Sequence, residues 1–298
     1  MAGYESQHAQ EETEVIGEGL TPGRTRGIFR GWFLAAIGAV ITVLGDTPFY
    51  GCLPIWNPVL RNAFGWTSGH MSWAYATVQV RGVLFGPAEG LLIQKLGPRR
   101  AIYIGLTIFG IGFLLFSQLH ELWQLYATFV IMSFGTALGT WLPMMTVLNH
   151  WFIRSKTQAM AIMMEGHAIG GMTVPLLMAW AIGGTDPSVS ERLGWQLVAF
   201  IIGAVIIAAA FPLSHLVHNR PEDLGMLPDG GPPQVVNDVS KAETFEEEDA
   251  GYTWQEAIKT RPFWLISFGH AGSSVIIVAI MVHLGLMLDD RGYSLQTI

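Results

Sequence analysis

The sequence predicts an all-α integral membrane protein, and three observations support this fold class. Hydrophobic residues make up 51% of the 298-residue chain and charged residues only 13%, well below the ~25% typical of soluble domains. Seven mostly apolar stretches reach the ~20 residues that a helix needs to cross the ~30 Å of membrane hydrocarbon. Basic residues gather on one side of these stretches, which is the usual bias of cytoplasmic loops.

The predicted spans are separated by polar segments that we assign to the cytosol. Residues 1–30, a polar and acidic segment, are expected to form a disordered cytosolic tail. Residues 218–260 are rich in proline, glycine and acidic residues and are expected to form a cytosolic linker. This linker separates a six-helix transmembrane bundle over residues 31–217 from residues 261–298, the seventh span and the start of an eighth helix. The predicted spans are 31–57, 71–94, 101–119, 123–151, 157–182, 194–217 and 262–287.

The distribution of the 16 Lys and Arg residues predicts the orientation. With the N-terminus inside, 12 lie on the inner side and only Arg61, Arg192 and Arg291 on the outer side, which leaves Arg81 within the membrane. This bias predicts a multi-pass protein of the plasma or inner membrane of the cell, with a cytoplasmic N-terminus. An eighth helix has barely begun at Ile298, so we expect a C-terminally truncated chain.

Arg81 and Asp46 are predicted to lie at matching depths in the second and first spans. At 1.5 Å per residue they are ~20 Å and ~22 Å from the inner ends of their helices. An ionised side chain at mid-membrane costs about 2.5–3.5 kcal/mol, so it normally faces a partner or a cavity. One interpretation is a permanent Asp46–Arg81 pair that fixes packing. In the other, Arg81 faces a central cavity and holds or gates an anion, because a guanidinium stays charged and can bind a carboxylate bidentately.

The first span carries three prolines around two polar side chains. Pro48, Pro54 and Pro58 interrupt the helical hydrogen bonds, which is tolerated at membrane depth only beside protein or a water-filled cavity. We therefore expect a bent outer half, with Tyr50 and Asn57 either on a substrate pathway or in kinked packing.

Glu89 lies near the inner end of the second span, where we expect a role in gating or packing. Arg99 or Arg100 in the following loop could reach it there. Eight residues separate Glu89 from Arg81, a rise of ~12 Å along a helix, and helical side chains lean toward the N-terminus. A direct bond between Arg81 and Glu89 is therefore not expected.

Two titratable residues of the fifth span, Glu165 and His167, are candidates for proton coupling. A carboxylate in a membrane can stay protonated at neutral pH because desolvation disfavours its charged form. The alternatives are a neutral Glu165 that bonds to a neighbouring helix and a histidine that is simply packed.

Residues 90–100, GLLIQKLGPRR, resemble the loop motif Gly-x-x-x-Asp-Arg-x-Gly-Arg-Arg that follows the second span in the major facilitator superfamily. Six spans, an inner linker and a second bundle are also the plan of that superfamily. The alternative is an ordinary basic inner loop with a turn at Gly97. The resemblance implies an inner gate that packs helices through small residues, with Glu89 beside it and with Gln94 and Lys95 in place of the motif's Asp and Arg. The gate residues would be Gly90, Gln94, Lys95, Gly97, Arg99 and Arg100.

Further stretches resemble the monocarboxylate and oxalate/formate carriers of this superfamily. The resemblance implies a major-facilitator-type N-terminal six-helix bundle plus the first helix of the second bundle. It also implies a secondary active transporter that moves a small, monocarboxylate-like organic anion by alternating access, with proton symport. A lysine that holds the substrate carboxylate in the mammalian carriers corresponds to Gly51 here. The stretches are 49–73, 149–162, 166–177, 194–200, 220–230 and 261–271.

The expected partners are the lipid bilayer, a small anionic substrate and the missing C-terminal helices of the same protein. No metal, cofactor or nucleic acid is expected, and the lone Cys52 excludes a cysteine cluster. One alternative is an integral membrane enzyme that uses Glu165, His167 and His150, and another is a non-transporting membrane receptor. The sequence has no H-E-x-x-H, G-x-S-x-G or phosphate-binding glycine loop, so an enzyme is not expected.

Overall fold

A computed structural model describes residues 29–183, 193–230 and 254–293, and these residues form helices joined by turns. The predicted all-α class is therefore confirmed. The predicted tail lies outside the described residues up to residue 28. The middle of the predicted linker, 231–253, and the expected start of an eighth helix, 294–298, also lie outside them.

The first predicted span is divided into three elements, as the prolines led us to expect. Pro48 and Pro54 each stand in the first turn of a new element, where a missing N–H costs no intrahelical hydrogen bond. Side chains satisfy two of the carbonyls at the break: the Trp56 indole N–H donates to the carbonyl of Pro48 over 2.9 Å, and the Thr136 hydroxyl donates to that of Gly45 over 2.9 Å. The elements are α2 (Arg30–Gly45), the π-helical η1 (Thr47–Gly51) and α3 (Leu53–Phe64).

The described residues contain five helical segments that are long and apolar enough to cross a membrane, rather than the seven predicted spans. The first predicted span is shortened by its break, and the second corresponds to α4 (Ser68–Leu96), which is less apolar and contains Arg81 and Glu89. The five segments are α5 (Pro98–Phe116), α6 with α7 (Leu122–Gly139 and Trp141–Trp151), α8 (Lys156–Ile182), α9 (Trp195–Leu216) and α12 (Arg261–Asp289).

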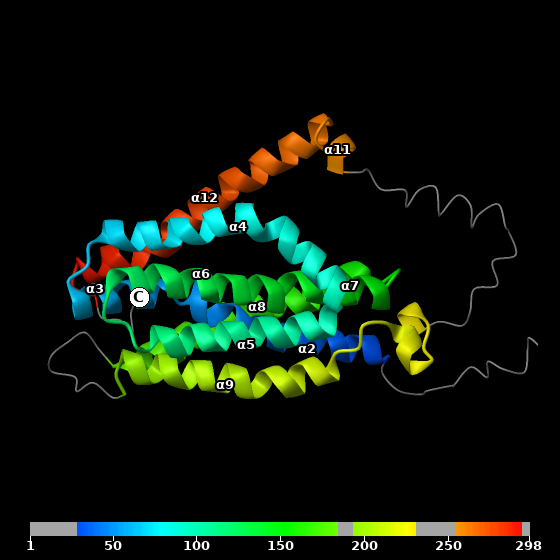
Figure 1. Ribbon diagram of the computed structural model, residues 1–298, viewed down its shortest axis with the longest axis horizontal. Helices are drawn as coiled ribbons and strands as arrows, with labels where there is room; N and C mark the ends of the chain where they lie inside the picture. The colour runs from blue at the N-terminus through cyan, green and yellow to red at the C-terminus, as the bar shows by residue number, and fades with distance from the viewer. Residues whose placement is uncertain (1–28, 184–192, 231–253, 294–298) are drawn as a thin grey trace, which may run out of the picture.

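Helix α4 changes direction in its second half, where Figure 1 shows it bending toward α7. Pro87 lies inside this part of the helix, and a proline removes one main-chain hydrogen bond and clashes with the preceding turn. Gly86 and Gly90 flank Pro87, and a side chain at either position would meet open space. Gly90 therefore does not pack two helices together, contrary to the expectation from the loop motif.

Glycines bring the main helix pairs close together elsewhere. Helix α5 packs against α6 and α9, and α2 packs against α8. A Cβ atom on Gly105 of α5 would lie 2.2 Å from the backbone nitrogen of Gly139 on α6. Such contact between backbones is how small residues join helices in membranes. A cluster of buried aromatic rings, among them Trp56, Phe113 and Phe116, fills the core between α3 and the end of α5.

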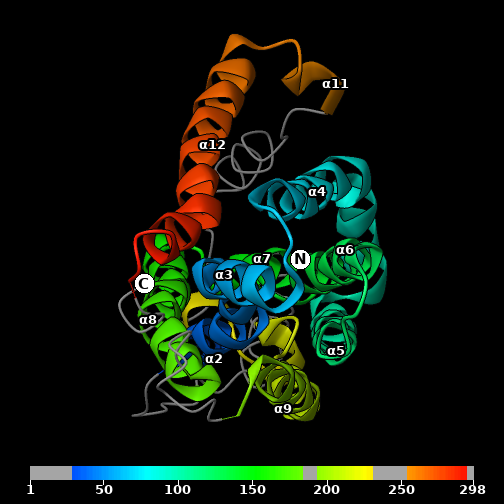
Figure 2. The ribbon, with the colours of Figure 1, turned by 90° about the vertical axis from the view of Figure 1, so that its left-hand side faces the viewer.

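Helix α12 diverges from the other long helices toward its N-terminal end (Figures 1 and 2). Its first ten residues, 261–270, are all exposed, whereas Gly285 and Leu286 near its end are buried. The helix packs against α3 and α4. Short helical turns occur on either side of the undescribed stretch: η2 (Pro221–Leu224), η3 (Pro228–Gly230) and α11 (Trp254–Ala257).

Candidate functional site

The break in the first span places Asp46 beside α8. Asp46 lies between α2 and η1, and its carboxylate Oδ2 atom lies 2.8 Å from Nδ1 of His167. The Asp46 side chain is 18% exposed and that of His167 is 52% exposed. The predicted Asp46–Arg81 pair is therefore wrong, because each residue has a different partner.

Two glycines of α8 allow the contact between Asp46 and His167. A Cβ atom on Gly166 would lie 2.4 Å from the carbonyl oxygen of Ala39 on α2, and one on Gly170 would lie 2.6 Å from the Thr47 hydroxyl. A larger residue at either position would push α8 away from the break. The glycine spacing of the fifth span thus sets the distance across which His167 can reach Asp46.

Arg81 forms an ion pair with Glu89 of the same helix, through Nη1 and Oε1. The expectation that these two residues do not bond is wrong, because it assumed a straight helix and α4 bends between them. Both side chains are buried, at 8% and 3% exposure. Arg99, one of the arginines expected to reach Glu89, instead has its Nη2 atom 2.6 Å from Nδ1 of His215.

The guanidinium of Arg81 is not fully satisfied by Glu89. Its Nε atom is buried and has no hydrogen-bond partner among the described residues. A buried donor without a partner is rare in proteins and costs the full desolvation of that group. Arg81 therefore has spare capacity to donate to a carboxylate or another anion.

Two tyrosines lie near the ion pairs of the site. Tyr50 of η1 lies within electrostatic range of Asp46, Arg81 and Glu89. The rings of Tyr50 and Tyr75 meet edge to face, with 6.3 Å between their centroids. The sequence reasoning missed Tyr75, because a tyrosine in an apolar span is ordinarily a packing residue. The structure therefore brings together most of the predicted cavity residues.

Two other predicted residues differ in their exposure to solvent. Asn57 is buried within α3, so it does not line an open pathway in this conformation. Glu165 is exposed on α8, and the part of the chain that the structure describes offers it no hydrogen-bond or ion-pair partner. The predicted bond from Glu165 to a neighbouring helix is therefore not present. No such contact joins Glu165, His167 and His150 within the described residues, which leaves the enzyme alternative without an assembled site.

The inner-loop motif is fastened to the end of α9. Gly97 has a φ of +79°, which lets the chain turn from α4 into α5. The backbone N–H of Arg99 donates to Oδ1 of Asn219 over 3.0 Å. Gln94, Lys95 and Arg100 are exposed. The motif is thus held by one bundle, and several of its charged residues are accessible.

Asp229 fastens the loop between α7 and α8, and no sequence pattern indicated this contact. Its carboxylate accepts hydrogen bonds from the backbone N–H groups of Ile153, Arg154 and Ser155, over 3.0, 2.7 and 3.4 Å. Asp229 has a φ of +59°, in the left-handed region that aspartate tolerates better than most residues. Desolvation favours the protonated acid, but these backbone donors outweigh it and lower the pKa of the Asp229 carboxyl group.

Comparison with known proteins settles the family. Residues 35–298 match the Major Facilitator Superfamily. The chain belongs to this superfamily. The match includes every helix that carries the ion pairs and both fastened inner loops. A multi-pass membrane protein follows from this membership and from the five long apolar helices.

Relatives of the chain found by sequence comparison are named for different functions. "Monocarboxylate transporter 6" of Homo sapiens is 26% identical over 180 residues, which are 59% of this chain and 34% of that protein. A "Probable hexose phosphate transport protein" of Chlamydia trachomatis is 27% identical over 139 residues, 46% of this chain and 28% of that protein. "Membrane sensor protein UhpC" of Salmonella typhimurium is 24% identical over 199 residues, 64% of this chain and 42% of that protein. The chain therefore spans less than half the length of these relatives.

Proposed function

We propose that the complete protein is a secondary active transporter that moves a small organic anion by alternating access, together with a proton. The observation that carries this proposal is the buried Arg81–Glu89 pair whose guanidinium has an unpartnered Nε atom. Two relatives are named for the transport of monocarboxylates and of hexose phosphates, which are both anions. The positive-inside bias supports a cytoplasmic N-terminus in the plasma or inner membrane.

The pairing of Arg81 suggests how anion and proton are coupled. A substrate carboxylate that binds the guanidinium competes with the carboxylate of Glu89. Once displaced, Glu89 would be a buried charge without a counter-ion, so it takes up a proton. One proton then accompanies each monovalent anion, and the transport cycle moves no net charge. Asp46 holds the ring of His167 on α8, as a second group that can exchange a proton.

Counterflow in proteoliposomes tests the transport of anions. The complete gene product is reconstituted with unlabelled carboxylate inside, and uptake of labelled small carboxylates, sugar phosphates and neutral analogues is compared. We expect Arg81→Lys to weaken uptake and Arg81→Ala to abolish it, while Arg291→Ala, which removes an exposed arginine, leaves uptake unchanged. Absence of exchange for every organic anion would contradict the proposal.

A pH gradient tests the role of Glu89. We expect Glu89→Gln to retain exchange at equal pH and to lose accumulation driven by a pH gradient, because the amide cannot carry the proton. Glu165→Gln is the matched comparison, since Glu165 is exposed and unpaired within the described residues. Loss of accumulation in Glu165→Gln instead would assign the proton to Glu165.

A membrane sensor is the second candidate function. The relative that is named a membrane sensor matches 64% of this chain, and the same anion site could report a ligand without moving it. A sensor would bind the anion, which would raise the melting temperature of the purified protein, and would give no counterflow. Binding without exchange would therefore favour this candidate.

A further inference from the structure

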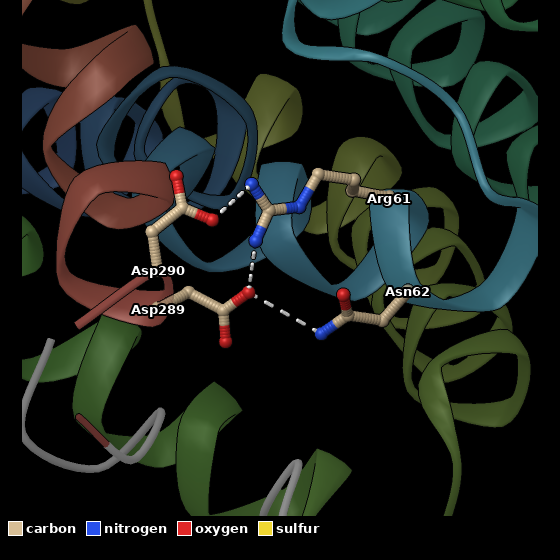
Figure 3. A network of polar contacts seen from close by, with 4 residues as sticks. All are labelled: Arg61, Asn62, Asp289 and Asp290. Carbon is tan, nitrogen blue, oxygen red and sulfur yellow. Dashed lines mark hydrogen bonds and ion pairs between the residues drawn. The ribbon is translucent and has the colours of Figure 1, made fainter. Parts of the chain in front are cut away.

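A group of four polar residues joins the ends of α3 and α12 (Figure 3). Nη2 of Arg61 lies 2.5 Å from Oδ2 of Asp289, and Nη1 lies 2.8 Å from Oδ1 of Asp290. The Asn62 amide adds a longer hydrogen bond of 3.4 Å to Oδ2 of Asp289. One guanidinium is therefore shared between two consecutive carboxylates of a helix that is 228 residues away in the sequence.

Close backbone packing places these charges opposite one another. A Cβ atom on Gly285 of α12 would lie 2.0 Å from the carbonyl oxygen of Pro54, so only glycine permits this approach to α3. Asp289 follows one helical turn later and faces Arg61 in the last turn of α3. The contact between the two helices thus includes one close backbone crossing and one ionic group.

This contact lies at one end of α12 alone. Residues 261–270 at the opposite end are exposed, and Figure 2 shows this end of the helix standing well away from α2, α3 and α8. The inner loops that precede α5 and α8 belong to the far end of the bundle from Arg61. The two helices therefore meet on the predicted outer side and diverge toward the inner side.

We propose that Arg61, Asp289 and Asp290 form an outer latch, which closes the passage between α3 and α12 in this conformation and breaks when the passage opens outward. The inference rests on the proposed transport function. The accessibility of the group fits a contact that forms and breaks: Arg61 is 20% exposed, Asp289 12% and Asp290 64%. Water and salt reach such a pair, so its net contribution is small and it can separate during a cycle. The alternative is a permanent staple, that is, a contact that holds α3 and α12 together throughout the transport cycle.

Reversible cross-linking distinguishes a latch from a staple. Cys52, the only cysteine of the chain, is replaced by serine, and Asn62→Cys with Asp289→Cys is joined by a short bifunctional thiol reagent that a reductant cleaves. Arg61 and Asp290 remain in place. A latch predicts loss of counterflow on cross-linking and recovery after reduction, whereas the same treatment leaves the counterflow of each single cysteine variant as it was before treatment. Unchanged counterflow in the cross-linked protein overturns the latch. Absence of counterflow in the untreated parent protein would instead contradict the transport function.

A distance measurement tests the latch without any transport assay. Spin labels on Asn62→Cys and Met287→Cys, both exposed positions, report the separation of α3 and α12. A latch predicts a second, longer distance whose population increases several-fold in Arg61→Ala and not in Arg291→Ala, which removes an exposed arginine near the same helix end. A single distance in all variants overturns the proposal, and two distances that Arg61→Ala leaves in the same proportion overturn it as well.

Discussion

Two arginine-centred ionic groups within the described residues have similar chemistry and opposite surroundings. Arg81 and Glu89 lie on one bent helix, and both are almost completely buried. Arg61 reaches from α3 to two aspartates on α12, and water has access to all three side chains. A buried charge that loses its partner is strongly destabilising, whereas an exposed pair contributes little. The first pair can therefore open only when another charged group replaces a partner, and the second can open by itself.

The largest expected effect is on the buried pair. Glu89→Ala leaves Arg81 charged and buried, and we expect it to lower the free energy of unfolding by about 3–5 kcal/mol. The double variant Arg81→Ala with Glu89→Ala should regain most of this stability, because no unpaired charge remains, while transport stays absent. Denaturation in detergent micelles measures both. Equal stability of the single and double variants would show that the pair is not desolvated as the structure indicates.

An intermediate effect is expected for the pair between Asp46 and His167, which depends on helix packing. Gly166→Ala places a methyl group against the carbonyl of Ala39, and overpacking of this kind costs about 1–3 kcal/mol. Gly171→Ala is the matched control, because no atom lies within 4 Å of a Cβ atom at that position. Thermal unfolding of the two variants checks the difference. If Gly171→Ala is as destabilising as Gly166→Ala, the contact between α8 and α2 does not set the register of the pair.

A small effect is expected at the exposed pair. Arg61→Ala should lower the free energy of unfolding by about 1 kcal/mol or less, and the difference from the wild type should vanish at ~1 M salt, where the Debye length falls to ~3 Å. Melting temperatures at low and high salt, with Arg291→Ala as control, provide the measurement. A loss that persists at high salt would mean that packing, rather than charge, is what Arg61 supplies.

The smallest effect concerns Asp229, which joins η3 to the loop between α7 and α8 and is partly exposed to solvent. The folded state lowers the pKa of its carboxyl group, so its contribution to stability is complete above the unfolded value of ~3.9 and disappears as the pH falls through the lower folded value. We expect Asp229→Asn to be slightly less stable than the wild type at pH 7 and equally stable at very low pH. Asp223→Asn, which affects a carboxylate with one local hydrogen bond to Arg220, is the control. A difference that grows on acidification would contradict this sign.

Local features of the sequence predicted a good part of the fold and of the site. The prolines of the first span indicated its break, because each proline removes a main-chain donor at a known position. A polar or charged side chain in an apolar span is costly and usually has a functional or structural role. This argument identified each of five residues separately: Asp46, Tyr50, Arg81, Glu89 and His167. The position of each residue along its helix was sufficient for this part of the prediction.

The pairing of these residues could not be read from the sequence. The depths of the residues along straight helices suggested that Asp46 pairs with Arg81. Instead, the bend of α4 brings Arg81 to Glu89, and the glycines of α8 allow Asp46 to contact His167. Arg61 and Asp289 are separated by 228 residues, so their contact depends on how α12 crosses α3. The packing of the helices in three dimensions determines which residues pair, and no local sequence pattern contains this information.

The crossing of Gly285 over Pro54 makes α12 a long lever with its pivot near one end. Between Gly285 and Arg261 the helix runs for ~36 Å at 1.5 Å per residue, so a tilt of about 10° at the pivot displaces the far end by ~6 Å. At the pivot itself a glycine rests on a carbonyl group, so the two backbones touch there without a side chain of residue 285 between them. A movement of about an ångström at the three charged side chains thus corresponds to several ångströms at the opposite membrane face.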